Sequence, residues 1–179
     1  PNTTVFESLT TNSSGIAEVT HWQLNQLVGD NHIYSNAAGL SDQAIHFHAT
    51  GTPAAPHSIA IVSGDGQSAT VARQVTTDPL VVVRDEFGNL TPDVTVTFAT
   101  DSDSGTIANN SVVTAANGRA SGGHWTLGTV VGTNTLTASF THSGTTTAVV
   151  FTATSTPDVA VSLTRVQDVN VSGSNTNTT

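Results

Sequence analysis

Three histidines and one tyrosine stand at alternate positions of two short segments. His32 and Tyr34 lie in the first segment, and His46 and His48 lie in the second. Residues two apart in an extended strand point to the same face, so each pair shares one face if its segment is a strand. Neutral imidazoles bind zinc, copper or nickel, which makes His32, His46 and His48 candidate metal ligands.

Two other interpretations of this group remain open. Tyrosine is enriched at the centre of protein interfaces, so the same four residues, His32, Tyr34, His46 and His48, also form a candidate partner-binding face. They equally fit surface positions without a function. The metal interpretation lacks a close carboxylate, because the nearest aspartates in the sequence fall in segments expected to be loops. These are Asp30 and Asp42.

Most other acidic residues are expected in turns. Their hard oxygen ligands are candidates for calcium at a junction between domains, although no segment matches an EF-hand loop. Solvated turns are the default interpretation, so we expect no bound cofactor, with calcium as the alternative. The residues concerned are Asp65, Asp85, Glu86, Asp93, Asp101 and Asp103.

The chain carries no motif that predicts catalysis. It has no G-x-S-x-G nucleophile elbow. Gly64-Asp65-Gly66 is not a phosphate loop, because no lysine follows it and no helix is expected there. We therefore expect that the protein is not an enzyme.

Composition limits the partners of the protein. Its 179 residues include no cysteine, only 9% are charged, and the formal net charge is −9. An acidic chain without a basic patch binds nucleic acid and anionic lipid poorly. No apolar run approaches the roughly 20 residues of a membrane-spanning helix. We expect protein partners, no nucleic acid and no direct membrane span. The low-charge surface, rich in Thr, Ser, Asn and Gly, fits an exported protein, either periplasmic or at the cell surface.

Strands separated by turns must position these side chains. Residues 79–154 contain short runs that alternate apolar and polar residues, such as Val94-Thr95-Val96-Thr97-Phe98. Period two, rich in Val and Thr and interrupted by Gly, Asn and Asp, predicts half-buried antiparallel strands. Several such strands within about 80 to 100 residues predict an all-β sandwich. The apolar run at residues 80–84 predicts a strand in the middle of a sheet.

The chain also contains an internal repeat. Residues 15–24 match residues 118–127 at an offset of 103, and residues 47–53 match residues 151–157 at an offset of 104. The first copy corresponds only to the C-terminal half of the unit. Such a match predicts two copies of one structural unit, the first of them incomplete.

This repeat sets the expected organisation of the chain. Residues 1–52 form the half unit, residues 53–57 a linker, and residues 58–155 the complete sandwich. Residues 156–179 form an extended or partly disordered tail, which also fits the start of a further unit. The strands expected in the half unit are residues 3–9, 16–24, 31–37 and 44–50, and residues 119–127 are expected as one strand of the complete unit.

The repeat also predicts the register of the half unit. A hairpin that closes around residues 37–43 places Tyr34 opposite His46 and His32 opposite His48. The inward set of the complete unit is expected to be Leu136, Ala138, Phe140, Val149, Phe151 and Ala153. Its equivalents are Ile33, Ser35, Ala37, Ile45, Phe47 and Ala49.

Two tryptophans occupy equivalent places in the copies. Trp22 and Trp125 follow His21 and His124. Aromatic residues dominate sandwich cores, so we interpret both tryptophans as core residues rather than as platforms that stack on carbohydrate. The two histidines are expected to share a structural role.

A set of motifs in a fixed order runs through residues 58–155. They are Pro79-Leu80-Val81-Val82-Val83, Asp85 with Gly88-Asn89, Val94-Thr95-Val96-Thr97-Phe98, Asn117-Gly118 with Ala120, Trp125-Thr126-Leu127-Gly128 and Gly132-Thr133-Asn134-Thr135-Leu136-Thr137-Ala138. With these motifs the unit resembles the bacterial immunoglobulin-like repeat domains of the invasin and intimin adhesin type. The resemblance implies a seven-stranded immunoglobulin-like antiparallel β-sandwich, usually in tandem arrays on bacterial surfaces and without catalytic residues.

We expect, from this resemblance, a structural or interaction module within a surface stalk or adhesin. One alternative is an accessory structural subunit that docks on a larger cell-envelope complex through its Tyr/His face and its N-terminal half unit. Another is a carbohydrate-binding module, which requires exposed Trp22 and Trp125.

Overall fold

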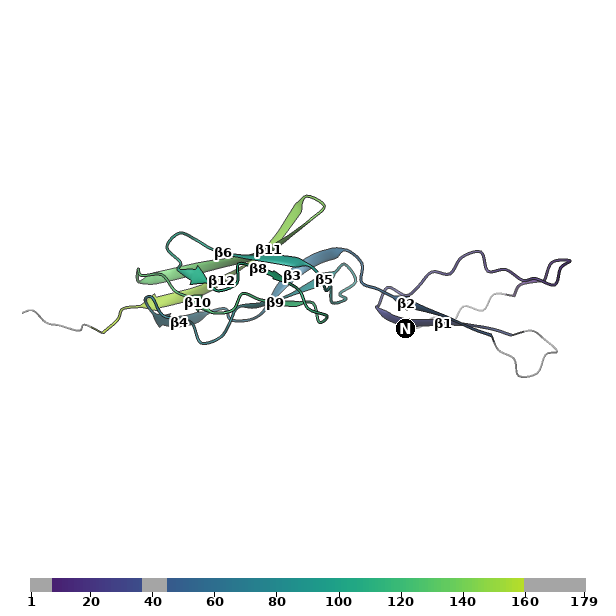
Figure 1. The fold of residues 1–179 in the computed structure, drawn as a ribbon, viewed down its shortest axis with the longest axis horizontal. Coiled ribbons are helices and arrows are strands. Elements are labelled where there is room, and N and C mark those ends of the chain that lie inside the picture. Colours follow the sequence, from purple (N-terminus) through teal and green to yellow (C-terminus); the bar gives the residue numbers. More distant parts are fainter. Residues whose placement is uncertain (1–7, 37–44, 160–179) are drawn as a thin grey trace, which may run out of the picture.

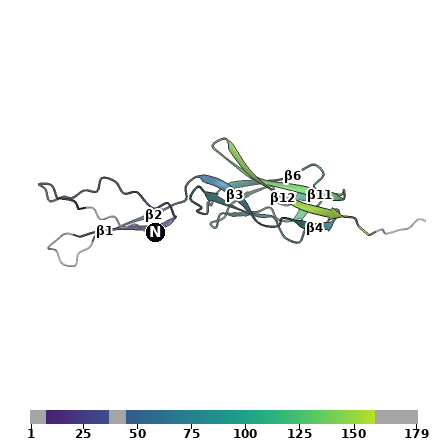
Figure 2. The same ribbon diagram turned by 180° about the vertical axis from the view of Figure 1, so that it is seen from behind.

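A computed structural model describes residues 8–36 and 45–159 of the chain. Every regular element in this part is a β-strand. Figures 1 and 2 show an elongated molecule, with a two-stranded hairpin toward one end and a sandwich of two sheets toward the other. No helix that could span a membrane occurs among these residues. The chain is an all-β protein with one complete immunoglobulin-like sandwich, preceded by half of a second unit.

The hairpin of the half unit pairs β1 (Gly29–Ser35) with β2 (Ile45–Gly51) in antiparallel orientation. Both strands alternate polar and apolar residues, as half-buried strands do. The strand expected at residues 16–24 is absent, and that prediction is wrong. The equivalent residues of the complete unit pair with β5 and β7, and no strand pairs with residues 16–24 among the residues that the structure describes. The strand expected at residues 3–9 lies mostly outside the described residues.

The larger sheet of the complete unit has five strands in the order β4-β12-β11-β6-β8. All pairs are antiparallel except β12 with β4, which is parallel. The strands are β4 (Gln67–Thr70), β6 (Thr95–Thr100), β8 (Ser111–Val113), β11 (Gly132–His142) and β12 (Thr145–Thr156).

The second sheet has three strands, with β5 (Leu80–Asp85) between β3 (Pro56–Ser63) and β9 (Arg119–Ser121). The central position of β5 confirms what its continuous apolar run predicted. β3 begins at Pro56, so the strand includes the last two residues of the expected linker.

The strand expected at residues 119–127 is divided into β9 and β10 (Trp125–Thr126), and β10 pairs with β7 (Thr106–Ile107). The division falls at two glycines. Gly123 has a φ of +68°, which residues with a side chain rarely adopt. At Gly122, a Cβ atom would lie only 3.0 Å from the Phe98 ring.

The core lies between the two sheets of the complete unit. The predicted inward residues are confirmed there: Leu136, Ala138, Phe140, Phe151 and Ala153 are at most 3% exposed, and Val149 packs against them. Trp125 is fully buried, and its indole N–H donates to the Ser104 carbonyl at 2.9 Å. Trp125 is therefore a core residue, as predicted, because both its apolar surface and its polar group are satisfied inside.

One asparagine makes the same two hydrogen bonds in both copies. In the complete unit, Asn134 Oδ1 accepts from the Gly128 N–H at 2.8 Å, and Nδ2 donates to the Gly132 carbonyl at 3.2 Å. In the half unit, Asn31 Oδ1 accepts from the Asn25 N–H at 2.9 Å, and Nδ2 donates to the Gly29 carbonyl at 3.0 Å. The backbone entering β1 and β11 is thus held in the same way.

Candidate functional site

The polar face of the β1–β2 hairpin carries the predicted His and Tyr residues in the predicted register. His32 lies opposite His48 and Tyr34 lies opposite His46. The His32 and His48 ring centroids are 5.1 Å apart, and the Tyr34 and His46 rings meet edge to face at 4.1 Å. The predicted pairing is confirmed, and it brings all four rings to one exposed face of the half unit.

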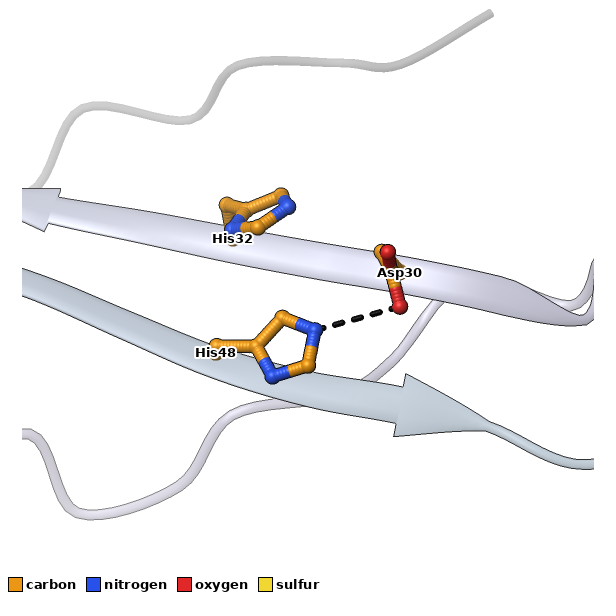
Figure 3. A group of neighbouring side chains, drawn as sticks. All are labelled: Asp30, His32 and His48. Atoms are coloured by element: carbon orange, nitrogen blue, oxygen red, sulfur yellow. Dashed lines mark hydrogen bonds and ion pairs between the residues drawn. The ribbon is translucent and has the colours of Figure 1, made fainter.

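Asp30 belongs to the same face, which the sequence analysis missed because it placed Asp30 in a loop. Asp30 lies within β1, two residues before His32. Its Oδ1 is 3.1 Å from His48 Nε2, and the Thr50 hydroxyl donates to it at 3.5 Å. The dashed line in Figure 3 marks the contact with His48. The contact with His48 lowers the pKa of the Asp30 carboxyl below its ordinary value. The alternation of Asp30 and His32 in the sequence was the signal for this carboxylate.

Asp30, His32 and His48 form a cluster of three side chains with metal-binding atoms. One ligand atom of each lies within 4.8 Å of the other two, and all three residues are exposed. His46, the third histidine predicted as a ligand, contacts Tyr34 instead. Asp42 lies outside the described residues.

The opposite face of the hairpin is apolar, and no second sheet covers it among the described residues. Ile33 lies directly opposite Phe47, in the register that Leu136 and Phe151 occupy in the complete unit. Leu136 and Phe151 are fully buried, whereas Phe47 is 51% exposed. Ile45 is also exposed. The half unit therefore presents the inner face of a sandwich to solvent.

The two tryptophans differ in burial. Trp22 is only partly buried, so the prediction of a core position is right for Trp125 and wrong for Trp22. Trp22 lies outside any strand, in the segment that finds no pairing partner. Burial of Trp125 means that the row of two exposed tryptophans required for carbohydrate binding is not formed.

The histidines beside the tryptophans also differ in their contacts. His124 Nδ1 is 3.0 Å from Asp78 Oδ1, whereas His21 Nδ1 is 3.3 Å from the hydroxyl of its neighbour Thr20. The contact of His124 joins the segment between β9 and β10 to the segment before β5. His21 makes only a local contact, so the expected shared role is not seen in these bonds.

Besides Asp85, two of the predicted turn carboxylates accept hydrogen bonds within the chain. Asp65 Oδ1 accepts from the Thr152 N–H at 2.7 Å, which lowers the pKa of its carboxyl. Asp101 accepts from the Thr135 hydroxyl. These contacts give both carboxylates a structural role in the sandwich, and calcium binding stays a prediction.

The side chains of Asn89 and Asp85 form a hydrogen-bond network at the junction between the two units. Asn89 Oδ1 accepts from the Val28 N–H at 3.1 Å, and Asn89 Nδ2 donates to the Gln26 carbonyl at 2.8 Å and to Asp85 Oδ2 at 2.7 Å. Asp85 Oδ2 also accepts from the Ala54 N–H in the linker at 2.9 Å. Sequence reasoning placed Asp85 and Asn89 in a turn and did not foresee that this turn binds the half unit.

Asp85 is charged although it is almost fully buried. Burial raises the pKa of its carboxyl, but hydrogen bonds from Asn89, Ala54 and Phe87 lower it by more, so the net pKa lies below the ordinary value. A carboxylate that accepts several N–H bonds is stabilised in its charged form. The junction is thus built around a buried anion.

Comparison with known proteins adds little to this description. No protein-family model matches the chain, and no curated protein matches it in sequence. The solved structures that it resembles include the D0-D1 domain of intimin, at 19% sequence identity and a TM-score of 0.39. The match covers 69% of this chain and 63% of the intimin chain. The chain therefore spans less than two thirds of the length of the intimin structure. A likeness at this level carries no argument about function, and the assignment of an immunoglobulin-like sandwich rests on the strand pairing and the core described above.

Proposed function

We propose that this chain is a non-catalytic structural and interaction module of an exported bacterial protein, in which tandem immunoglobulin-like units form part of a surface stalk or adhesin. The observation that carries the proposal is the bonded junction. Both N–H groups of the Asn89 amide donate and its oxygen accepts, so three hydrogen bonds of one side chain join Gln26, Val28 and Asp85. A stalk needs consecutive units that are held end to end, and this contact supplies the attachment.

The linker supports the same proposal. Pro53 and Pro56 restrict its backbone, and the Ala54 N–H is bound by Asp85. In both views the hairpin continues the long direction of the sandwich (Figures 1 and 2). The low-charge surface rich in Thr, Ser, Asn and Gly supports export to the periplasm or the cell surface.

The state of the protein in its source tests this proposal. Gentle extraction followed by native mass measurement is expected to find these residues as an internal stretch of a longer polypeptide that carries no other chain. Recovery in fixed stoichiometry with different polypeptides would contradict the stalk and support the second candidate.

That second candidate is an accessory subunit docked on a larger cell-envelope complex, and the uncovered apolar face of the hairpin favours it. In the complete unit, β3 packs against β11 and β12. The equivalent cover for Ile33, Ile45 and Phe47 is a polypeptide segment that supplies strands like β3 and β5, with apolar residues at alternate positions. Exposed apolar side chains gathered on one face favour a site of interaction with another protein.

Two variants separate the possible docking faces of this subunit. Changing Ile33 and Phe47 to Thr removes the apolar face, and changing Tyr34, His46 and His48 to Thr removes the Tyr/His face. We expect the first variant to lose the associated polypeptides and the second to keep them. If both variants retain every association, the docking proposal is wrong.

A further inference from the structure

The polar face of the hairpin carries a cluster of metal-binding side chains that the stalk proposal does not use. We propose that Asp30, His32 and His48 bind one divalent cation of intermediate softness, with Zn²⁺ as the best-matched ion. Two neutral imidazoles and a carboxylate are ligands that zinc takes in proteins. The proposal is independent of how the half unit is attached or covered.

The backbone of the hairpin places the three ligands. Asp30 and His32 alternate on β1 and so share a face, and His32 lies directly opposite His48 on β2. The three side chains therefore come from adjacent positions of a paired sheet rather than from independent loops. Figure 3 shows Asp30 and His32 on one strand and His48 on the facing strand.

The present distances between the ligand atoms are close to those of a tetrahedral zinc site. Zinc–ligand bonds of roughly 2.0–2.1 Å at tetrahedral angles put neighbouring ligand atoms about 3.3 Å apart. His48 Nε2 and Asp30 Oδ1 are already 3.1 Å apart. All three ligand atoms lie within 4.8 Å of one another, so each pair is within about 1.5 Å of the separation that a tetrahedral zinc site requires.

The surroundings of the cluster favour an ion that remains accessible. The Thr50 hydroxyl donates to Asp30 Oδ1 at 3.5 Å, and such outer contacts orient a metal-binding carboxylate. The side chains of His48 and Asp30 are 53% and 65% exposed, so a cation reaches them directly from solvent. Three protein ligands leave a fourth position for water or for a side chain of a partner.

The second copy of the repeat lacks every one of these ligands. Thr133, Thr135 and Thr152 stand where the first copy has Asp30, His32 and His48. Thr135 and Thr152 are paired in β11 and β12 as His32 and His48 are in the hairpin. The same strand frame therefore occurs once with ligands and once without, which defines the substitutions for a test.

Calorimetric titration of the full chain with ZnCl₂ at pH 7.5, in a buffer that does not chelate metals, tests the proposal. We expect one saturable site per chain, reversed by EDTA, and no site for CaCl₂, because hard cations prefer oxygen ligands. The variants Asp30→Thr, His32→Thr and His48→Thr are each expected to weaken binding by about tenfold or more. Threonine suits strands, so these changes preserve the hairpin.

Two histidine variants serve as matched controls. His46→Thr changes the same face of β2 without removing a proposed ligand, and His142→Thr changes an exposed histidine in the complete unit. Both are expected to keep the zinc affinity of the unmodified chain. Absence of a saturable site in that chain, or equal weakening by His46→Thr and His48→Thr, overturns the assignment. So does equal weakening by His142→Thr and His48→Thr.

Discussion

Ile33 and Phe47 face each other across the hairpin of the half unit, in the register that buries Leu136 and Phe151 in the complete unit. Phe47 is 51% exposed and Phe151 is 0% exposed. One repeat position thus occurs in two environments within one chain. The β3-β5-β9 sheet covers this position in the second copy, and no such sheet covers it among the described residues of the first.

The same substitution, Phe to Ala, is therefore expected to have a large effect on stability at one of the two equivalent positions and a small effect at the other. Phe151→Ala is expected to lower the free energy of unfolding of the complete unit by about 3–5 kcal/mol, because it leaves a cavity in a closed core. Phe47→Ala is expected to change it by less than about 0.5 kcal/mol, because the residue is outside that core. Denaturant unfolding measures both, followed by the fluorescence of buried Trp125 in chains that also carry Trp22→Phe. Similar costs for the two variants would show that the half unit has a covered core.

Asn89→Ala is expected to loosen the half unit from the sandwich, because it removes three hydrogen bonds of one side chain. The loss also leaves Asp85 with fewer donors and costs about 1–3 kcal/mol of stability. Small-angle X-ray scattering is expected to show a broader range of molecular dimensions than in the unmodified chain. Asn117→Ala is the matched control, since Asn117 accepts only the local Arg119 N–H within its own turn. Identical scattering of all three proteins would rule out Asn89 as the attachment.

The lowered pKa of Asp85 predicts that the stability of the protein decreases at low pH. Its pKa in the folded protein lies below the ordinary value of 3.8, so its contribution is fully present above about pH 4 and is lost as the pH falls through the folded pKa. Asp85→Asn removes this titration, so the variant is expected to be less stable at pH 7 and to lose stability less steeply in acid. Denaturant midpoints measured between pH 7 and pH 3 test the sign. Asp103→Asn, at an exposed turn, controls for the change in net charge.

The half unit is expected not to fold alone. An isolated two-stranded hairpin is marginally stable in water, and residues 1–52 supply only β1 and β2 among the described strands. A peptide of residues 1–52 is expected to lack a cooperative thermal transition by circular dichroism, whereas residues 53–159 are expected to show one. A cooperative transition of the shorter peptide would refute this expectation.

Sequence pattern alone determined the local features of this protein. Period-two alternation identified β1, β2 and most strands of the sandwich, and the repeat identified Phe151 as an inward residue. The pairing of Tyr34 with His46 also followed, because the register of a hairpin depends on a short connection. These features are set by residues close together in the chain or by matching positions in the two copies.

Tertiary structure alone decided the features that depend on distant partners. The strand expected at residues 16–24 does not form, and within the described residues no strand lies beside it as β5 and β7 lie beside β9 and β10. Trp22 stays partly exposed for want of an opposing sheet. Asn89 binds Gln26 and Val28 across more than 60 residues, and no local pattern encodes such a contact. Burial and long-range hydrogen bonding require a second surface, and only the folded chain shows which surfaces meet.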